Sequence, residues 1–411
     1  MKINFFINGF PENKDNGYNM IFYLDQSDDG DVADNYIEIE GNRYSLERIR
    51  GVQKLSVPFT DPTKRYAYSV FEKGVFKYGG SFIAKPTDPK ICCVSCNASL
   101  DVKVPCWAQY GTYDGYKDGN WKLIHDESPE LIIHMGDQIY ADGVFKSGKD
   151  IEKRIRFLYI HTYANQWQGV SMRNSLNMMI ADDHEALDGF GNPEKKINSA
   201  NEKYSEYIET AVNMYVKYQP TLATPEFGSF NFQYGGYEII CIDMRLDYNK
   251  FGHVMSDRIL EFTENVLSTT SQNDVIMILP RPLIIISKEM AELIKKRTEY
   301  ADMLMSPGNQ ERTKRFIDLM DQYDKNYTVV CGDSHLGLKM DIRLKNKTIT
   351  QYITSGITVK PTDRMVPFWR QRVEKNLRSL PNDYDVANID LVTLGNNYGI
   401  LQNGVFNIKA I

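Results

Sequence analysis

From residue 91 onward, short apolar runs of strand length alternate with longer stretches that have helical spacing, and this alternation constrains the fold more than any other feature. Apolar runs of four or five residues without a polar face are typical of strands buried on both faces of a sheet. Strands that alternate with helices predict a layered α/β domain. The predicted strands are 91–95, 131–134, 178–181, 239–242, 275–279 and 328–331, and the predicted helices are 149–166, 201–218, 257–268, 287–304 and 309–324.

Both ends of the chain depart from this alternation. In the first 88 residues, apolar and aromatic side chains alternate with polar ones, as in 3–7 and 66–70, which predicts a small all-β sandwich. Pro86 and Pro89 restrict the residues before them and mark a boundary. The predicted domains are therefore 1–88, an N-terminal β-sandwich, and 89–411. Near the end of the chain, 352–356 and 398–401 predict closing antiparallel strands.

Composition excludes several classes of protein. The chain has 411 residues, of which 48 are Lys or Arg and 54 are Asp or Glu, so the net charge of −6 argues against a nucleic-acid coat protein. No segment reaches the roughly 18 apolar residues of a membrane span, and the N-terminal apolar stretch breaks at Asn8 and Gly9, too early for a signal-peptide core. These features predict a cytoplasmic or otherwise intracellular protein. Six cysteines do not make a disulfide framework.

Reactive side chains follow four of the predicted strands. In layered α/β folds, ligands bind beyond the carboxyl ends of strands. Taken singly, a buried thiol, a Gly-Asp turn or a surface histidine has a structural explanation. Four such clusters together predict a metal site. They are Ser95-Cys96-Asn97, Gly136-Asp137-Gln138-Ile139-Tyr140, Asp182-Asp183-His184-Glu185 and Gly332-Asp333-Ser334-His335.

In these clusters, the sequence resembles the PhoD-like (alkaline phosphatase D-like) metallophosphatases of the metallophosphoesterase superfamily. The Ser-Cys opening, Gly-Asp-x-Ile-Tyr and Asp-Asp-His-Glu are typical of that branch, and 230–235 and 242–245 resemble its middle region. The resemblance runs in order over about residues 66–402. It implies a layered metallophosphoesterase-like β-sandwich flanked by helices, with the metal-dependent phosphoesterase domain over 89–411. It also implies hydrolysis of phosphate esters, as a phosphatase or phosphodiesterase, by metal-activated hydroxide.

The resemblance further implies two or more metal ions, with iron bound by a thiolate and a phenolate and calcium nearby. Manganese and magnesium stay open. Composition bears on the metals independently, because carboxylates and a phenolate suit hard cations and only His184 and His335 lie in the motifs, which disfavours a histidine-rich zinc site. Asp137 is implied to bridge two ions. The implied metal ligands are Cys96, Asp137, Tyr140, Asp183, Asp333 and His335.

Three further residues are assigned on the same resemblance and on side-chain chemistry. His184 is predicted to be catalytic, stabilising the transition state or protonating the leaving oxygen. Arg245 is predicted to hold phosphate oxygens through its planar fork, with a structural pairing to Asp243 or Asp247 as the alternative. Arg281 stands where many metallophosphoesterases have another metal-binding histidine. Because it cannot be a ligand, its role is either structural or a contact with substrate phosphate.

Two other functions are compatible with parts of the sequence. The alternative to an enzyme is a catalytically silent metal-binding or structural protein on the same fold. A nucleic-acid phosphodiesterase is disfavoured because the chain is acidic and has no basic stripe. The predicted partner is therefore a phosphate-ester substrate, without nucleic acid or a membrane span. The sequence leaves open the physiological substrate, mono- or diester preference, and oligomeric state.

Overall fold

A computed structural model describes most of the chain. The described residues are 2–14, 17–27, 35–47, 51–98, 111–112, 118–147, 150–190, 202–247, 254–285, 304, 308–361, 366–367 and 385–411. The helix predicted over 287–304 falls, apart from Leu304, outside these residues.

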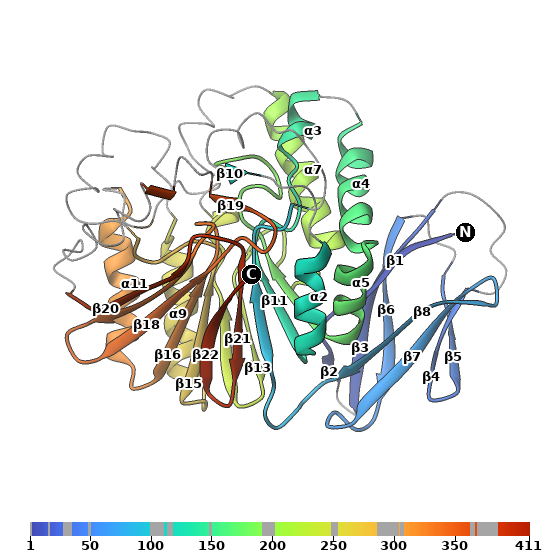
Figure 1. The fold of residues 1–411 in the computed structure, drawn as a ribbon, viewed down its shortest axis with the longest axis horizontal. Coiled ribbons are helices and arrows are strands. Elements are labelled where there is room, and N and C mark those ends of the chain that lie inside the picture. Colours follow the sequence, from blue (N-terminus) through green and yellow to red (C-terminus); the bar gives the residue numbers. More distant parts are fainter. Residues whose placement is uncertain are drawn as a thin grey trace.

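Two mixed β-sheets pack against each other, face to face, at the centre of the molecule (Figure 1). All six predicted strands are confirmed, with ends that differ by up to two residues. The five-stranded sheet has the order β12 (Leu176–Ile180), β11 (Leu131–Met135), β9 (Ile91–Val94), β21 (Asn397–Gln402) and β22 (Val405–Ala410). The seven-stranded sheet has the order β13 (Phe230–Tyr234), β14 (Tyr237–Cys241), β15 (Asp274–Leu279), β16 (Asn326–Cys331), β18 (Thr348–Thr354), β17 (Gly337–Arg343) and β20 (Asp385–Thr393).

The apolar runs bury both faces of their strands. In the seven-stranded sheet, Ile276 and Ile278 share a core with Ile91 and Cys93 of the five-stranded sheet. The alternate residues, such as Met277, pack instead against the helices on the outer face. Because successive side chains point to opposite faces of a strand, a run without polar residues is what a two-sided burial requires. The fold is therefore the layered α/β arrangement predicted from the sequence.

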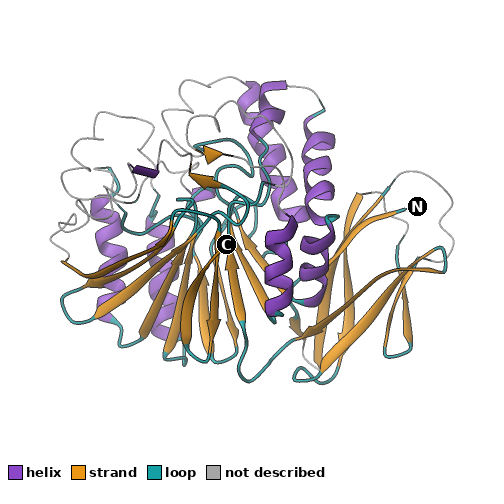
Figure 2. Ribbon diagram, viewed as in Figure 1, coloured by secondary structure: helices purple, strands orange, loops and turns teal. Residues whose placement is uncertain are grey.

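Helices cover the outer face of each sheet (Figure 2). On the seven-stranded side lie α9 (Asp257–Thr269) and α11 (Gln310–Gln322), and on the other side α2 (Asp118–Glu127), α4 (Ile151–Tyr163), α5 (Gln166–Asn174) and α7 (Glu202–Tyr218). The helix predicted over 149–166 is confirmed as α4, with ends that differ by two and three residues, and it is followed by α5, which was not predicted. Asn165, with φ −60° and ψ 145°, breaks the helical path between them. The sequence pattern also missed α2 and the short α3 (Asp142–Ser147).

The tail of the chain partly differs from its prediction. β21 pairs antiparallel with β9 and with β22, as predicted for 398–401. The strand predicted at 352–356 is β18, which runs antiparallel to β17 but parallel to β16. A purely antiparallel closing segment is therefore wrong for this strand. A further two-stranded sheet joins β10 (Gly111–Thr112) to β19 (Lys360–Pro361).

The described residues between 2 and 83 form two four-stranded antiparallel sheets, which confirms the predicted N-terminal β-sandwich architecture. One contains β1 (Ile3–Asn8), β2 (Glu12–Lys14), β3 (Gly17–Gln26) and β6 (Gly51–Phe59). The other contains β4 (Tyr36–Ile39), β5 (Asn42–Ser45), β7 (Arg65–Glu72) and β8 (Val75–Ile83). The division into domains at residue 88 stays a prediction.

Among the described residues, no helix combines the length and the apolar character that a membrane crossing needs.

Candidate metal centre

The predicted reactive clusters meet where strands of the two central sheets end. Cys96 follows β9, Asp137 follows β11, Asp183 follows β12, and His335 follows β16. These strands come from both sheets, so the site lies across the seam between them. Gly332 makes this approach possible, because a Cβ there would lie 2.8 Å from the backbone oxygens of Met135 and Pro280.

Within the part of the chain that the structure describes, three overlapping groups of side chains have ligand atoms within 4.8 Å of one another. The first, named here the thiolate group, contains Cys96, Asp137 and His335. A second contains Asp137, Asp183 and His184. The third, named here the acid group, contains Asp182, Asp183 and Asp333. The predicted ligands other than Tyr140 are all members of at least one group.

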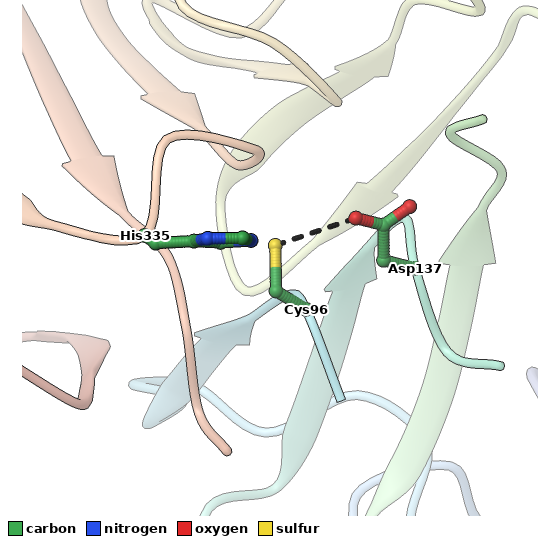
Figure 3. Close-up of side chains that lie close together, drawn as sticks. All are labelled: Cys96, Asp137 and His335. Atoms are coloured by element: carbon green, nitrogen blue, oxygen red, sulfur yellow. Dashed lines mark hydrogen bonds between the residues drawn. The ribbon is translucent and has the colours of Figure 1, made fainter. Parts of the chain in front are cut away.

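The thiolate group joins both sheets (Figure 3). The Cys96 Sγ lies 3.5 Å from Oδ2 of Asp137, and both side chains are buried. Tyr140 donates its hydroxyl to the same Oδ2 at 3.2 Å, so it belongs to this end of the site. Burial raises the pKa of Cys96, Asp137 and Tyr140 well above their usual values, and for Cys96 and Tyr140 the neighbouring negative charges add to the effect.

The chemistry of this donor set fits a metal ion. A thiol, a carboxyl and a phenol that are packed together retain their protons when no metal ion is bound, because ionisation in a buried place is costly. A bound cation reverses this preference by making the ionised forms favourable. Thiolate, carboxylate, phenolate and imidazole are ligands of transition metals such as iron. The residues present therefore suit a metal at the thiolate group.

The two histidines of the site have opposite charge preferences. Burial works against a charged His184, but the carboxylates of Asp142, Asp183 and Asp137 outweigh it and raise its pKa well above the usual value. Nδ1 of His184 lies 2.8 Å from Oδ2 of Asp142. Burial and the nearby His184 lower the pKa of His335 to about 4. At neutral pH, His184 is thus a proton donor. His335 is a neutral imidazole, which is the protonation state that a histidine needs in order to bind a metal ion.

Two arginines contact the acid group. The side chain of Arg245, which is 1% exposed, pairs through Nε with Asp182 and places Nη2 3.3 Å from Oδ1 of Asp183. Its Nη1 donates to the carbonyl of Phe190 at 3.0 Å. The structural alternative named Asp243 or Asp247 as its carboxylate partner, whereas the observed partners are Asp182 and Asp183. The phosphate-binding role predicted for Arg245 stays a prediction.

Arg281 reaches the acid group from the more exposed side. Its Nε lies 3.4 Å from Oδ1 of Asp182, and its Nη2 lies 3.4 Å from Oδ2 of Asp183 and 3.3 Å from Oδ1 of Asp333. Burial alone would raise the pKa of Asp183, but Arg245, His184 and Arg281 together lower it strongly. For Asp182, burial outweighs the arginines and raises the pKa to about 7. Two guanidinium groups therefore offset part of the negative charge of the acid group.

Glu185 holds the strand ends in place without facing the thiolate group. Its Oε2 accepts hydrogen bonds from the backbone N–H groups of Asp137 and Asp182, both at 2.9 Å. Its Oε1 accepts from the backbone of Gln138 and the side chain of Gln219. This carboxylate therefore ties the ends of β11 and β12 together and fixes Asp137.

Two residues of the site were missed by the sequence reasoning. Asp142 orients and charges His184, yet it is the first residue of α3, which no motif included. Ser355 follows β18 directly, with its Oγ 3.1 Å from Sγ of Cys96 and accepting from the backbone N–H of His335 at 3.0 Å. The rule that found the other clusters, reading the residues after each strand, applies to Ser355 as well. The predicted strand 352–356 extended past it and hid that signal.

The histidine on β11 is a core residue. His134 is fully buried, with Nδ1 2.8 Å from Gln138 and Nε2 3.2 Å from Asn177, and it takes no part in the three groups.

Comparison with known proteins identifies the fold. No family model matches the chain, and no curated protein matches it. A solved structure described as "Structure of PhoD" superposes with a TM-score of 0.67 and 12% sequence identity, covering 99% of this chain and 88% of that chain. The likeness extends over both central sheets and the N-terminal sheets, since almost the whole chain is covered. At this identity it establishes architecture alone, and the chain therefore has a PhoD-like fold.

Proposed function

We propose that this protein is a metal-dependent phosphoric ester hydrolase, a phosphatase or phosphodiesterase. The observation that carries the proposal is the convergence of Cys96, Asp137 and His335, with ligand atoms within 4.8 Å of one another, in a PhoD-like fold. Phosphate-ester hydrolysis suits such a site because it needs positive charge and an activated water rather than a protein nucleophile.

In this proposal, Cys96, Asp137, Tyr140 and His335 hold the metal. A bound ion supplies two things at this position, namely a lowered pKa for water and neutralisation of charge on the phosphoryl oxygens. Iron is the proposed ion beside the thiolate and phenolate, since these ligands suit it, with calcium, manganese or magnesium as the proposed oxygen-bound ions. The proposed partner is a phosphate-ester substrate.

His184 is the proposed general acid. Its Nδ1 is held by Asp142 at 2.8 Å, and its ring lies against Tyr140 with 4.3 Å between ring centroids. These contacts fix the ring, and Nε2 is the nitrogen proposed to deliver a proton to the leaving oxygen. The His184 side chain is 15% exposed, so a bound substrate can contact it. The carboxylates around it raise its pKa, which favours the protonated form that a general acid needs.

Hydrolysis of two model esters tests the proposal. Protein purified without chelators is assayed with p-nitrophenyl phosphate and with its bis-ester, each with added Ca²⁺, Mn²⁺ or iron. We expect activity on at least one ester, loss of that activity on treatment with a chelator, and recovery when metal returns. Inactivity on both esters with every metal would refute the proposal and favour the catalytically silent metal-binding alternative.

Asp137→Asn is the matching variant, because it keeps the side-chain size and removes the charge that Cys96, Tyr140 and the backbone of His184 surround. We expect hydrolysis to fall to background. Asp318→Asn is the control, since Asp318 is a half-exposed residue paired with Lys314 on α11. Full activity in Asp137→Asn would exclude Asp137 from the site.

A further inference from the structure

One guanidinium group contacts every member of the acid group. Arg281 lies within 3.4 Å of a carboxylate oxygen of Asp182, Asp183 and Asp333. These are the same three side chains whose oxygens are close enough together to hold a metal ion. Arg281 therefore occupies the position from which a cation would contact all three carboxylates.

The Arg281 guanidinium and a metal ion exclude each other from the acid group, because both are positively charged. A guanidinium keeps its charge at any physiological pH, so neither Arg245 nor Arg281 can yield by losing a proton. Three ionised carboxylates and two guanidinium groups leave one formal negative charge in the acid group. A divalent ion at this position would meet repulsion from both arginines, and the three carboxylate oxygens that face Arg281, namely Oδ1 of Asp182, Oδ2 of Asp183 and Oδ1 of Asp333, already lie within 3.4 Å of its guanidinium nitrogens. Asp183 has an additional partner, because its Oδ2 accepts a hydrogen bond from the backbone N–H of Gly189 at 2.6 Å.

The two arginines differ in how firmly they are held. Arg245 is 1% exposed and has a close contact with Asp182 together with a hydrogen bond to a backbone carbonyl. Arg281 is 11% exposed, and its three carboxylate contacts of 3.3–3.4 Å are longer than the 2.7–2.9 Å typical of a charge-assisted hydrogen bond. Arg245 thus belongs to the framework of the site, and Arg281 is the group that substitutes for an ion.

We propose that the Arg281 guanidinium takes the place of a metal ion in the acid group, so that the centre binds metal only beside Cys96, Asp137 and His335. This deepens the proposed function, on which it rests for the presence of a metal at the thiolate group. It also assigns Arg281, for which the sequence left structural and phosphate-contacting roles open. In this assignment, Asp183 and Asp333 bind arginine rather than metal, so the acid group does not hold the calcium, manganese or magnesium ion proposed above. The centre then holds fewer ions than the two or more that the resemblance implies.

Counting bound ions tests the proposal without an activity assay. Wild-type protein, Arg281→Gln and Arg281→Lys are saturated with Mn²⁺, freed of excess ion by gel filtration and analysed for metal per chain. Glutamine removes the charge at similar length, whereas lysine keeps the charge. We expect Arg281→Gln to bind one more ion per chain than the wild type, and Arg281→Lys to bind the wild-type number. Equal numbers for Arg281→Gln and the wild type would overturn the proposal.

A second variant covers the case in which Arg281→Gln does not fold. Asp333→Asn keeps the side-chain size, and asparagine tolerates the positive φ of +65° at this position. Because Asp333 is assigned to Arg281, we expect Asp333→Asn to retain the wild-type metal content, and a lower content would overturn the assignment. These counts are independent of hydrolysis. An inactive protein with the expected counts would refute the proposed function alone, and an active protein with equal counts would refute only the role of Arg281.

Discussion

At the scale of single residues, the backbone conformation orients the side chains of the site. Cys96, Asp137, Asp333 and His335 have positive φ angles of 54–65°. This region costs an L-residue about 1–2 kcal/mol, and such strain is concentrated at functional sites. The turn that it creates directs each side chain back across the end of its strand. The sequence predicted that these strand ends meet at a metal site, but it did not predict the left-handed turns, because a cysteine such as Cys96 gives no signal for one.

Ser355 gives the first prediction at this scale. Its single hydroxyl accepts from the backbone N–H of His335, and its Oγ lies 3.1 Å from Sγ of Cys96. Once Cys96 is a thiolate, the serine hydroxyl must be the donor of that hydrogen bond. We expect Ser355→Ala to weaken metal binding about 10- to 100-fold, the range found for groups that support metal ligands. Titration of the metal-free protein with Mn²⁺ or Fe²⁺ measures the change.

Ser95→Ala is the control for Ser355→Ala. It removes a buried hydroxyl that lies 3.5 Å from the same sulfur atom but does not hold His335. A smaller loss of affinity is expected. Equal losses in the two variants would mean that Ser355 has no special part in orienting Cys96 and His335.

At the scale of elements, the contact between strand ends decides the geometry of the site. The buried strands were predictable because their apolar runs have no polar face, whereas the break between α4 and α5 depends on the backbone of Asn165 alone. The packing of one sheet on the other was also beyond the sequence, since nothing local to Gly332 shows that Ser95, Met135 and Pro280 surround it.

Gly332→Ala tests this contact. An alanine Cβ would lie 2.8 Å from two backbone oxygens and 3.0 Å from the Cβ of Ser95, so the strand ends must move apart. We expect a loss of about 1–3 kcal/mol in the free energy of unfolding, as for other overpacked cores, together with weaker metal binding. Urea denaturation and metal titration measure the two effects. Gly308→Ala, where a Cβ meets open space, should leave both unchanged; a stable Gly332→Ala variant with normal metal affinity would contradict the argument.

At the scale of the whole molecule, the N-terminal sheets share a core with the α/β layers. Phe5 on β1 packs edge-on against Tyr163 at the end of α4, with 5.2 Å between ring centroids. Asn8 donates to the backbone carbonyls of Arg173 and Ser175, beyond the predicted boundary at residue 88. Pro86 and Pro89 predicted where the chain passes from one part to the other, but a boundary in the chain gives no information on how much apolar surface the two parts bury together.

The buried carboxylate of Asp25 supplies the test of that coupling. Asp25 lies on β3, and Arg156 of α4 contacts its two oxygens at 3.0 and 3.1 Å. Removing one partner of a buried ion pair costs about 3–5 kcal/mol, because the other charge is left uncompensated. We therefore expect Arg156→Met to lose stability of this order in urea denaturation. The double variant Asp25→Asn/Arg156→Met should recover part of the loss, since no buried charge remains.

The same cycle on Lys314 and Asp318, an exposed pair within α11, provides the comparison and should give a coupling of only about 0.2–0.5 kcal/mol. If the two parts of the chain unfold together, as a shared core requires, the wild type should show a single transition by both fluorescence and circular dichroism. Losses at Asp25 and Arg156 that simply add would mean that this pair does not couple the N-terminal sheets to the helices. A large coupling would mean that the N-terminal sheets stabilise α4 through this ion pair, and through α4 the side of the five-stranded sheet that carries Asp137 and Asp183.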